Sequence, residues 1–413
     1  MADDGTHAAI ELAVRQSYGK LLAFLAARTG DLAGAEDALS EAFASALAAW
    51  PREGVPRSPE AWLLAIARRR TIDAARRHRT RAAATETLLL RTAEIEAGAE
   101  VGTVIPDERL RLMFACAHPA VPPDLRAPLI LQTVLGFDAA AIASAFLVAP
   151  ATMGQRLVRA KRKILEARIP FRMPEADELG ERLDSVLDAI YAAYAEGWTD
   201  PAGALARERG LAAEAIWLGR LVASLLPQEP EALGLLALML HAEARRGARR
   251  DGEGRYVPLA AQDPEAWDAP LIEEAEAILL RASAAERIGR FQLEAAVQSA
   301  HAARRRTGRI EWRAILSLYD ALLDRTESPV VAINRAVALA QVDGARAGLA
   351  ALDALGDDPR LAEYQPYWAA RASLLAETRD RAAADQAFER AIGLEPDPAV
   401  RHFLQQRRAR LFA

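Results

Sequence analysis

The stretch FDAAAIASAFLVAPATMGQRLVRAKRKIL, residues 137–165, decides the fold of the middle of the chain. Ile142 and Phe146 lie at i and i+4 of a short predicted helix, and a tight connection follows. The next segment carries an apolar repeat at i, i+4, i+7 and i+11, formed by Met153, Leu157, Ala160 and Ile164. Two helices whose apolar stripes face each other across a short turn predict a helix-turn-helix.

The other faces of the second helix are basic. They carry Thr152, Gln155, Arg156, Arg159, Lys161, Arg162 and Lys163, and Glu166 is the only acid nearby. A helix of this kind can enter the major groove, where residues near its start reach base edges and later cations neutralise phosphates. The alternative is a basic helix that is merely solvated.

A second basic helix is predicted after the proline-rich residues 51–59, because Ser58 is a good N-cap and Pro59 suits the first helical position. One polar stripe of this helix contains Arg69, Asp73, Arg76 and Arg77, and further charge comes from Arg68, Arg70, Arg79 and Arg81. Trp62 and Ile66 are expected to pack on the opposite side. The helix could follow a DNA backbone, although charged helix ends are commonly just solvated.

Composition places these helices in a larger all-α protein. The 413 residues are 52% hydrophobic but only 6% aromatic, and β-branched runs are scarce. A single cysteine, Cys116, excludes an internal disulfide framework. The net charge of −5 divides into +4 for residues 1–172 and −9 for the rest, which suits a nucleic-acid-binding front and a protein-facing back.

The positions of glycine and proline, which interrupt helices, predict the domain organisation. We expect helical domains at residues 10–82 and 107–170, a linker at 83–106, and a helical array at 177–413. Five residues near the end match the 34-residue tetratricopeptide pattern in type and spacing: Trp368, Ala384, Phe388, Ala391 and Pro396. The match is partial, because Arg371 and Ala372 replace Leu-Gly and Leu375 replaces a tyrosine.

Together, the two basic modules resemble the extracytoplasmic-function (ECF) sigma factors of bacterial RNA polymerase. The segment 18–79, with GDLAGAEDALSEAFASALAAW at 30–50 and the arginine-rich helix after Pro59, resembles their region 2. The block 107–165 is similar to their region 4. The resemblance extends to a group with a tetratricopeptide-like C-terminal extension through AEAIWLGRL at 213–221, PEALGLLALML at 230–240 and PVVAINRAVA at 329–338.

The resemblance implies a protein that binds core RNA polymerase through its β′ and β subunits, recognises promoter DNA and opens it. It assigns polymerase contacts to Glu36, Asp37, Ser40 and Glu41. It assigns the minus-10 element to Arg69, Asp73, Arg76 and Arg77. It assigns the minus-35 element to Thr152, Gln155, Arg156, Arg159, Arg162 and Lys163. The extension is expected to regulate these modules, with an unidentified protein or ligand as its partner.

Other functions are weighed against this one. Cys116 and His118 lack further ligands for a zinc site, so no metal or cofactor is predicted, and Cys116 is expected in the core. No nucleophile and base share a recognisable motif, so the chain is not expected to be an enzyme. No leader or membrane span is recognised, and a cytoplasmic protein is expected. The main alternative is a tetratricopeptide-containing regulator that binds duplex DNA without polymerase; a hydrolase is more distant.

Overall fold

The computed structural model describes residues 17–79, 107–145, 149–198, 206–356, 358 and 360–411. Within these ranges the regular structure is helical, apart from an isolated antiparallel bridge between Arg250 and Tyr256. The predicted all-α class is therefore confirmed. The expected linker, 83–106, lies outside the described residues. The contacts divide the chain into two compact units, Met1–Ala193 and Tyr194–Ala413.

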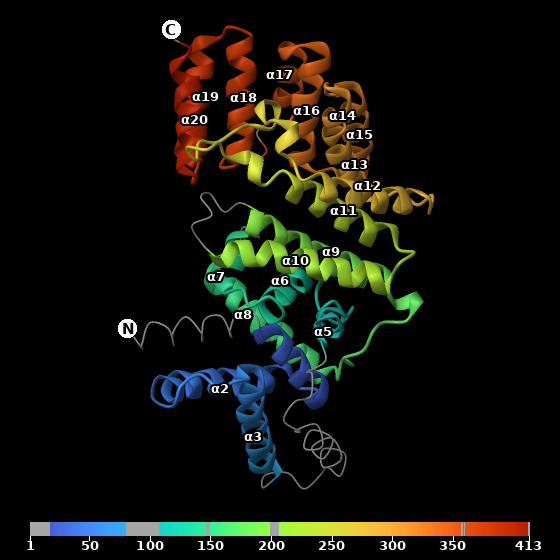
Figure 1. Cartoon of the computed structure of the whole chain (residues 1–413), viewed down its shortest axis with the longest axis vertical. Coiled ribbons are helices and arrows are strands. Elements are labelled where there is room, and N and C mark those ends of the chain that lie inside the picture. The colour runs from blue at the N-terminus through green and yellow to red at the C-terminus, as the bar shows by residue number, and fades with distance from the viewer. Residues whose placement is uncertain are drawn as a thin grey trace. The chain divides into compact units, whose positions relative to one another are not determined.

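The first unit begins with a helical bundle made by residues 17–29, α2 (Leu32–Glu53) and α3 (Pro59–Arg79) (Figure 1). Asp31 caps α2 by accepting a hydrogen bond from the Gly34 backbone, at 3.0 Å. Gly54 ends α2 with a φ of 86°, a backbone conformation that residues with a side chain rarely adopt. The next helix starts at Pro59, as predicted.

The rest of this unit is a second helical block. It consists of α5 (Arg109–Cys116), α6 (Pro123–Thr133), α7 (Ala139–Ala145), α8 (Pro150–Glu166), the short η1 (Ala176–Glu178) and the part of α9 (Gly180–Trp198) up to Ala193. Cys116 is fully buried, as expected, and its Sγ lies 3.5 Å from Thr133 Oγ1. Arg126 of α6 is 2% exposed and its Nη1 donates to Glu181 Oε1 of α9 at 2.6 Å. This ion pair attaches α9 to the block.

The second unit is an array of helices in which successive helices pack against one another. Its long helices are α10 (Ala206–Leu225), α11 (Pro230–Ala244), α12 (Ala269–Ser283), α13 (Arg290–Ala302), α15 (Trp312–Thr326), α16 (Pro329–Asp343), α17 (Ala345–Asp353), α18 (Gln365–Glu377), α19 (Arg381–Leu394) and α20 (Pro398–Ala409). Shorter turns are η2 (Gly247–Arg249), η3 (Leu259–Ala261), η4 (Pro264–Ala266) and α14 (Arg304–Thr307). Proline opens α11 and α16, and glycine follows α14 and α16, so the prolines at 230 and 329 and the glycines at 308 and 344 lie at helix ends.

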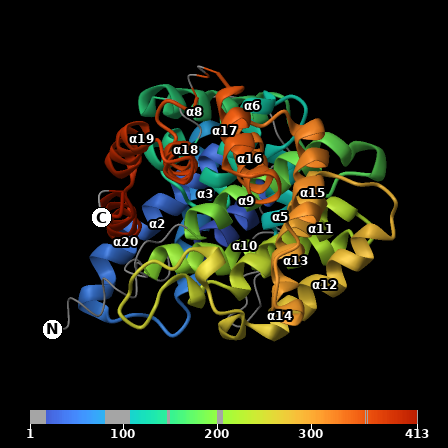
Figure 2. The same cartoon turned by 90° about the horizontal axis from the view of Figure 1, so that it is seen from above.

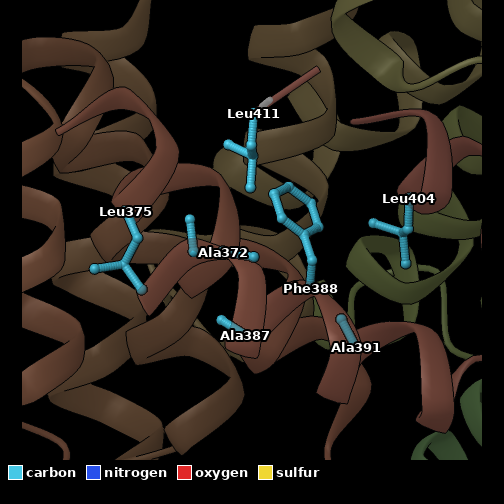
Figure 3. Close-up of a cluster of buried hydrophobic side chains, with 8 residues drawn as sticks. Ala372, Leu375, Ala387, Phe388, Ala391, Leu404 and Leu411 are labelled. Atoms are coloured by element: carbon cyan, nitrogen blue, oxygen red, sulfur yellow. The ribbon is translucent and has the colours of Figure 1, made fainter. Parts of the chain in front are cut away.

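The last helices show how the array packs (Figures 1 and 2). α18 and α19 form a helical pair, and α20 follows. Figure 3 shows the cluster between them, in which Phe388 is 1% exposed and is surrounded by small and branched side chains: Ala372, Leu375, Ala387, Ala391, Leu404 and Leu411. The alanines allow the helices to approach closely, while Phe388 fills the space between them. Trp368 packs at the edge of the cluster.

A long loop, residues 245–268, connects α11 to α12 and contacts the last helical segment. Asp251 Oδ1 accepts hydrogen bonds from the backbone N–H groups of Glu253 and Arg255, so residues 251–254 form a tight turn. Arg250 forms an ion pair with Asp397, the N-cap of α20. The ring of Tyr256 meets that of Phe403 edge to face, with centroids 5.4 Å apart. The loop thus contacts α20, which lies far from it in the sequence.

Candidate nucleic-acid interface

The basic helix α8 has one buried and one exposed face. Its buried residues are Met153, Leu157, Ala160 and Ile164, the apolar stripe predicted from the sequence. Ala149 caps the helix in an extended conformation, and Pro150 occupies its first position. The preceding α7 ends at Ala145, and residues 146–148, including Phe146, lie outside the described residues. The two predicted helices are therefore present.

The opposite face of α8 carries exposed polar and basic side chains. It exposes Thr152, Gln155, Arg159, Arg162 and Lys163. Arg156 is 42% exposed, and its Nη1 lies 3.5 Å from Asp124 Oδ2 of α6. Surface ion pairs of this length contribute little to stability, so Asp124 holds Arg156 only weakly. Five of the six predicted minus-35 residues are thus exposed, and the sixth is half-exposed.

Lys161 departs from the sequence interpretation, which placed it on the free basic face. Its side chain is 12% exposed, and Nζ lies 2.6 Å from Glu36 Oε2 on α2. Glu36, a predicted polymerase-binding residue, is itself 16% exposed. Burial raises the pKa of the Glu36 carboxyl, while the Lys161 ammonium acts against this shift. We call this ion pair the α2–α8 bridge. In it the Lys161 ammonium and the Glu36 carboxylate neutralise each other.

Backbone contacts accompany the bridge. A Cβ on Gly19 would lie 1.9 Å from the Val134 carbonyl oxygen at the end of α6, so the first helix approaches the second block as closely as a glycine permits. Gly136, with a φ of 70°, lies against the ring of Tyr18. Burial is the main cause that raises the pKa of the Tyr18 hydroxyl, and Glu36 adds to it. The two helical blocks of the first unit are therefore in direct contact.

The helix α3 divides its arginines between core and surface. Arg69 is exposed, as its predicted role requires. Arg68 was counted as surface charge, but it is 8% exposed and its guanidinium lies 5.3 Å from the Phe24 ring centroid. That part of the interpretation is wrong, because Arg68 packs on an aromatic face. Asp73, Arg76 and Arg77 belong to the helix, but their side chains lie outside the described residues.

The apolar side of α3 is broader than predicted. Leu63, Leu64 and Ala67 are buried, whereas Trp62 and Ile66 are half-buried. Trp62 meets Trp50 of α2 edge to face, with ring centroids 5.6 Å apart. This pair fixes α3 against α2 and holds its exposed arginine side outward.

The remaining predicted polymerase contacts lie along α2. Asp37, Ser40 and Glu41 are exposed. Glu41 Oε2 lies 3.0 Å from Arg70 Nε of α3, with both side chains at least half exposed. An exposed ion pair of this kind holds the Glu41 carboxylate only weakly. Glu36, by contrast, is paired with Lys161 in the α2–α8 bridge.

Both helical blocks of the first unit match known protein families. The profile described as sigma-70 region 2 matches residues 13–81, and the profile described as sigma-70, region 4 matches residues 111–164. An uncharacterised protein of Rhizobium meliloti (strain 1021) is 40% identical over 383 residues, covering 92% of this chain and 89% of that protein. The chain belongs to the sigma-70 family. No solved structure matches it.

The sigma factor continues into a third matched segment. A family of unknown function, DUF6596, matches residues 182–283, from α9 to the end of α12. Sigma-70 regions 2 and 4 act in promoter recognition, binding core RNA polymerase and promoter DNA. Among the described residues of this sigma factor, no helix is long and apolar enough to cross a membrane.

Proposed function

We propose that this chain is a sigma factor of the extracytoplasmic-function type whose C-terminal helical array regulates its activity in cis. It binds the β′ and β subunits of core polymerase, recognises a promoter, opens the DNA and performs no catalysis itself. The exposed basic face of α8, opposite a continuous buried stripe, is the observation that carries DNA recognition. The membership of the sigma-70 family supports core RNA polymerase as the partner.

The proposed roles follow the exposed residues. On α8, Thr152 and Gln155 lie in the first half of the helix and Arg159 lies just past its middle. These three would contact bases of the minus-35 element, while Arg162 and Lys163 would contact phosphates. Arg156 would join the base contacts after leaving Asp124. On α3, Arg69, Asp73, Arg76 and Arg77 would hold the minus-10 element. On α2, Asp37, Ser40 and Glu41 would contact polymerase, joined by Glu36 once it is released.

Run-off transcription with purified core polymerase tests this function on the region upstream of the protein's own gene. Arg159→Ala should lower promoter use about fivefold or more, because a lost base contact costs about 1–3 kcal/mol. Arg111→Ala is the matched control, since Arg111 is 51% exposed in the same block and pairs with Glu108. Equal transcription by both variants would contradict the assignment of α8.

The same experiment separates the alternative function. A regulator that binds duplex DNA alone would shift the promoter fragment without core polymerase and would produce no transcript with it. Regulation by the array is tested by removing residues 206–413 while keeping α9, because Glu181 neutralises the buried Arg126. A shortened protein that matches the full chain with purified polymerase and in cells would rule out the regulatory role.

The size and charge of the array support regulation. Stacked helices present an extended surface for a partner or ligand, far larger than promoter binding needs. The excess of acidic residues after position 172 could let the array dock on basic modules, an interaction that salt would weaken. The proposed tetratricopeptide character of the array is supported by the α18–α19 pair and its Phe388 cluster. Since its partner polymerase works in the cytoplasm, we also place the protein there.

A further inference from the structure

The exposed face of α8 carries an apolar side chain among its polar and basic ones. Val158, at the middle of the helix, is 67% exposed. Among the large apolar residues that the structure describes, only Leu280 of the array is more exposed, at 73%. A single exposed apolar residue is ordinary on a protein surface, so exposure alone decides nothing. The neighbours of Val158 on the helix distinguish it.

Val158 lies within the surface proposed to read the minus-35 element. Residues three or four positions apart are neighbours on one face of a helix. Gln155 precedes Val158 by three residues and Arg162 follows it by four, and both are exposed. Arg159, the next residue in the chain, is exposed as well. DNA that contacts these three side chains at once must therefore also cover Val158.

The described part of the protein gives Val158 no internal role. The buried residues of α8 are Met153, Leu157, Ala160 and Ile164, and Val158 is not among them. Valine is β-branched and is a weaker helix former than alanine, lysine or arginine. A helix face that met only water would thus gain neither packing nor helix stability from this side chain.

The chemistry of the major groove limits what Val158 can recognise. Guanine, cytosine and adenine present hydrogen-bond donors and acceptors there, whereas thymine also presents its C5-methyl group. Phosphate oxygens are charged and would lose solvation beside an apolar side chain. Of the groups that the bases and phosphates offer in the groove, the thymine methyl is therefore the one whose contact with valine is favourable.

We propose that Val158 contacts the C5-methyl group of a thymine in the minus-35 element and thereby helps to select the promoter. This contact rests on the proposed function of α8 as the helix that reads that element. Valine in a helix strongly prefers one χ1 rotamer, so its two methyl groups are oriented before DNA binds. The contact therefore orders little of the side chain, and it favours thymine over cytosine, which lacks the methyl group.

Replacement of thymine by deoxyuridine tests the proposal, because the two bases differ only by the C5-methyl group. The DNA is a fluorescent fragment of the region upstream of the protein's own gene, in which each thymine of the minus-35 element is replaced in turn. Equilibrium binding of the holoenzyme, formed from core polymerase and the full chain, is measured on every fragment. At one position the replacement should weaken wild-type binding about fourfold, the factor for one methyl-sized group removed from an apolar contact.

Val158→Ala should weaken binding to the unmodified fragment to a similar degree. Deoxyuridine at the same position should then have little further effect, because the two changes remove one shared contact. The matched control is Val330→Ala, the same substitution at a 39% exposed valine of α16 in the array. This control should bind the unmodified fragment as the wild type does and should respond equally to deoxyuridine.

Arg159→Ala, measured on the same fragments, separates this proposal from the proposed sigma function. If Arg159→Ala weakens binding while the effects of Val158→Ala and deoxyuridine are independent, the methyl contact is overturned and α8 still reads the element. Wild-type binding that deoxyuridine leaves unchanged at every position, or a minus-35 element without thymine, also overturns the contact. Absence of promoter-specific binding by the wild-type holoenzyme would overturn the proposed function itself, and the contact with it.

Discussion

The α2–α8 bridge can be tested by a double-mutant cycle with Lys161→Met, Glu36→Gln and the double variant. Removing one partner of a fully buried ion pair costs about 3–5 kcal/mol, because the other charge stays buried. Lys161 and Glu36 are 12% and 16% exposed, so solvent reduces this cost. We expect Lys161→Met to lower the free energy of opening between the blocks by about 2 kcal/mol, with a coupling of at least 1 kcal/mol.

The destabilisation caused by Lys161→Met should depend on pH. Burial raises the pKa of Glu36 above its unfolded value, so the carboxyl favours the folded state below the unfolded pKa, and this contribution is lost as pH rises through the folded pKa. Without Lys161 the opposing attraction is absent and the folded pKa rises further. Lys161→Met should therefore be more damaging at pH 7 than at pH 4.5. Glu36→Gln should remove that difference.

Hydrogen exchange of α2 and α8 in the full chain provides the measurement, because it reports opening of individual segments. The matched control is Arg162→Met, which removes one positive charge from the same helix at a side chain that is 68% exposed. Equal protection in Lys161→Met and Arg162→Met, or additive effects in the double variant, would refute the bridge.

Three further predictions concern single side chains. Arg68→Ala should lower stability by about 1 kcal/mol through lost packing on Phe24, whereas Arg69→Ala should leave the melting temperature unchanged and reduce transcription; a reversed pattern would contradict their assignment. Phe388→Ala should destabilise the array by about 3–5 kcal/mol in urea unfolding, and a loss below 1 kcal/mol would be inconsistent with its 1% exposure. Burial raises the pKa of Cys116 to about 12, so a thiol reagent at pH 8 should label it only after unfolding, and rapid native labelling would count against the buried position.

The sequence predicted which residues of a helix are buried. It did not predict the contacts of charged residues at the border of the buried face. The stripe of α8 followed from periodicity, because 3.6 residues per turn fix which side chains share a face. Lys161 was missed, although it lies four residues after Leu157 and three before Ile164, at the border of that stripe. Arg68 likewise follows the buried Leu64 by four residues. A charge at the border of an apolar stripe is the signal that could have found both.

A small polar cavity in the array, lined by His241, Arg245, Trp267, Gln298 and His301, was beyond sequence reasoning for a different reason. Its residues come from the ends of α11 and α13 and from the loop before α12, and each alone reads as an ordinary core or surface residue. Their gathering around one space is a property of the packed helices. Periodicity within one helix carries no information on which polar atoms of several segments share one enclosed space.

The contact between the long loop and α20 changes how the array should unfold. In a simple solenoid each repeat touches its neighbours, so the terminal helices can fray independently. Here Arg250 and Asp397 are 147 residues apart in the chain, and Tyr256 and Phe403 reinforce the same contact. Loss of the last helix would therefore also release the loop that supplies Trp267 to the polar cavity. The end of the chain and the interior of the array are expected to melt as one cooperative unit.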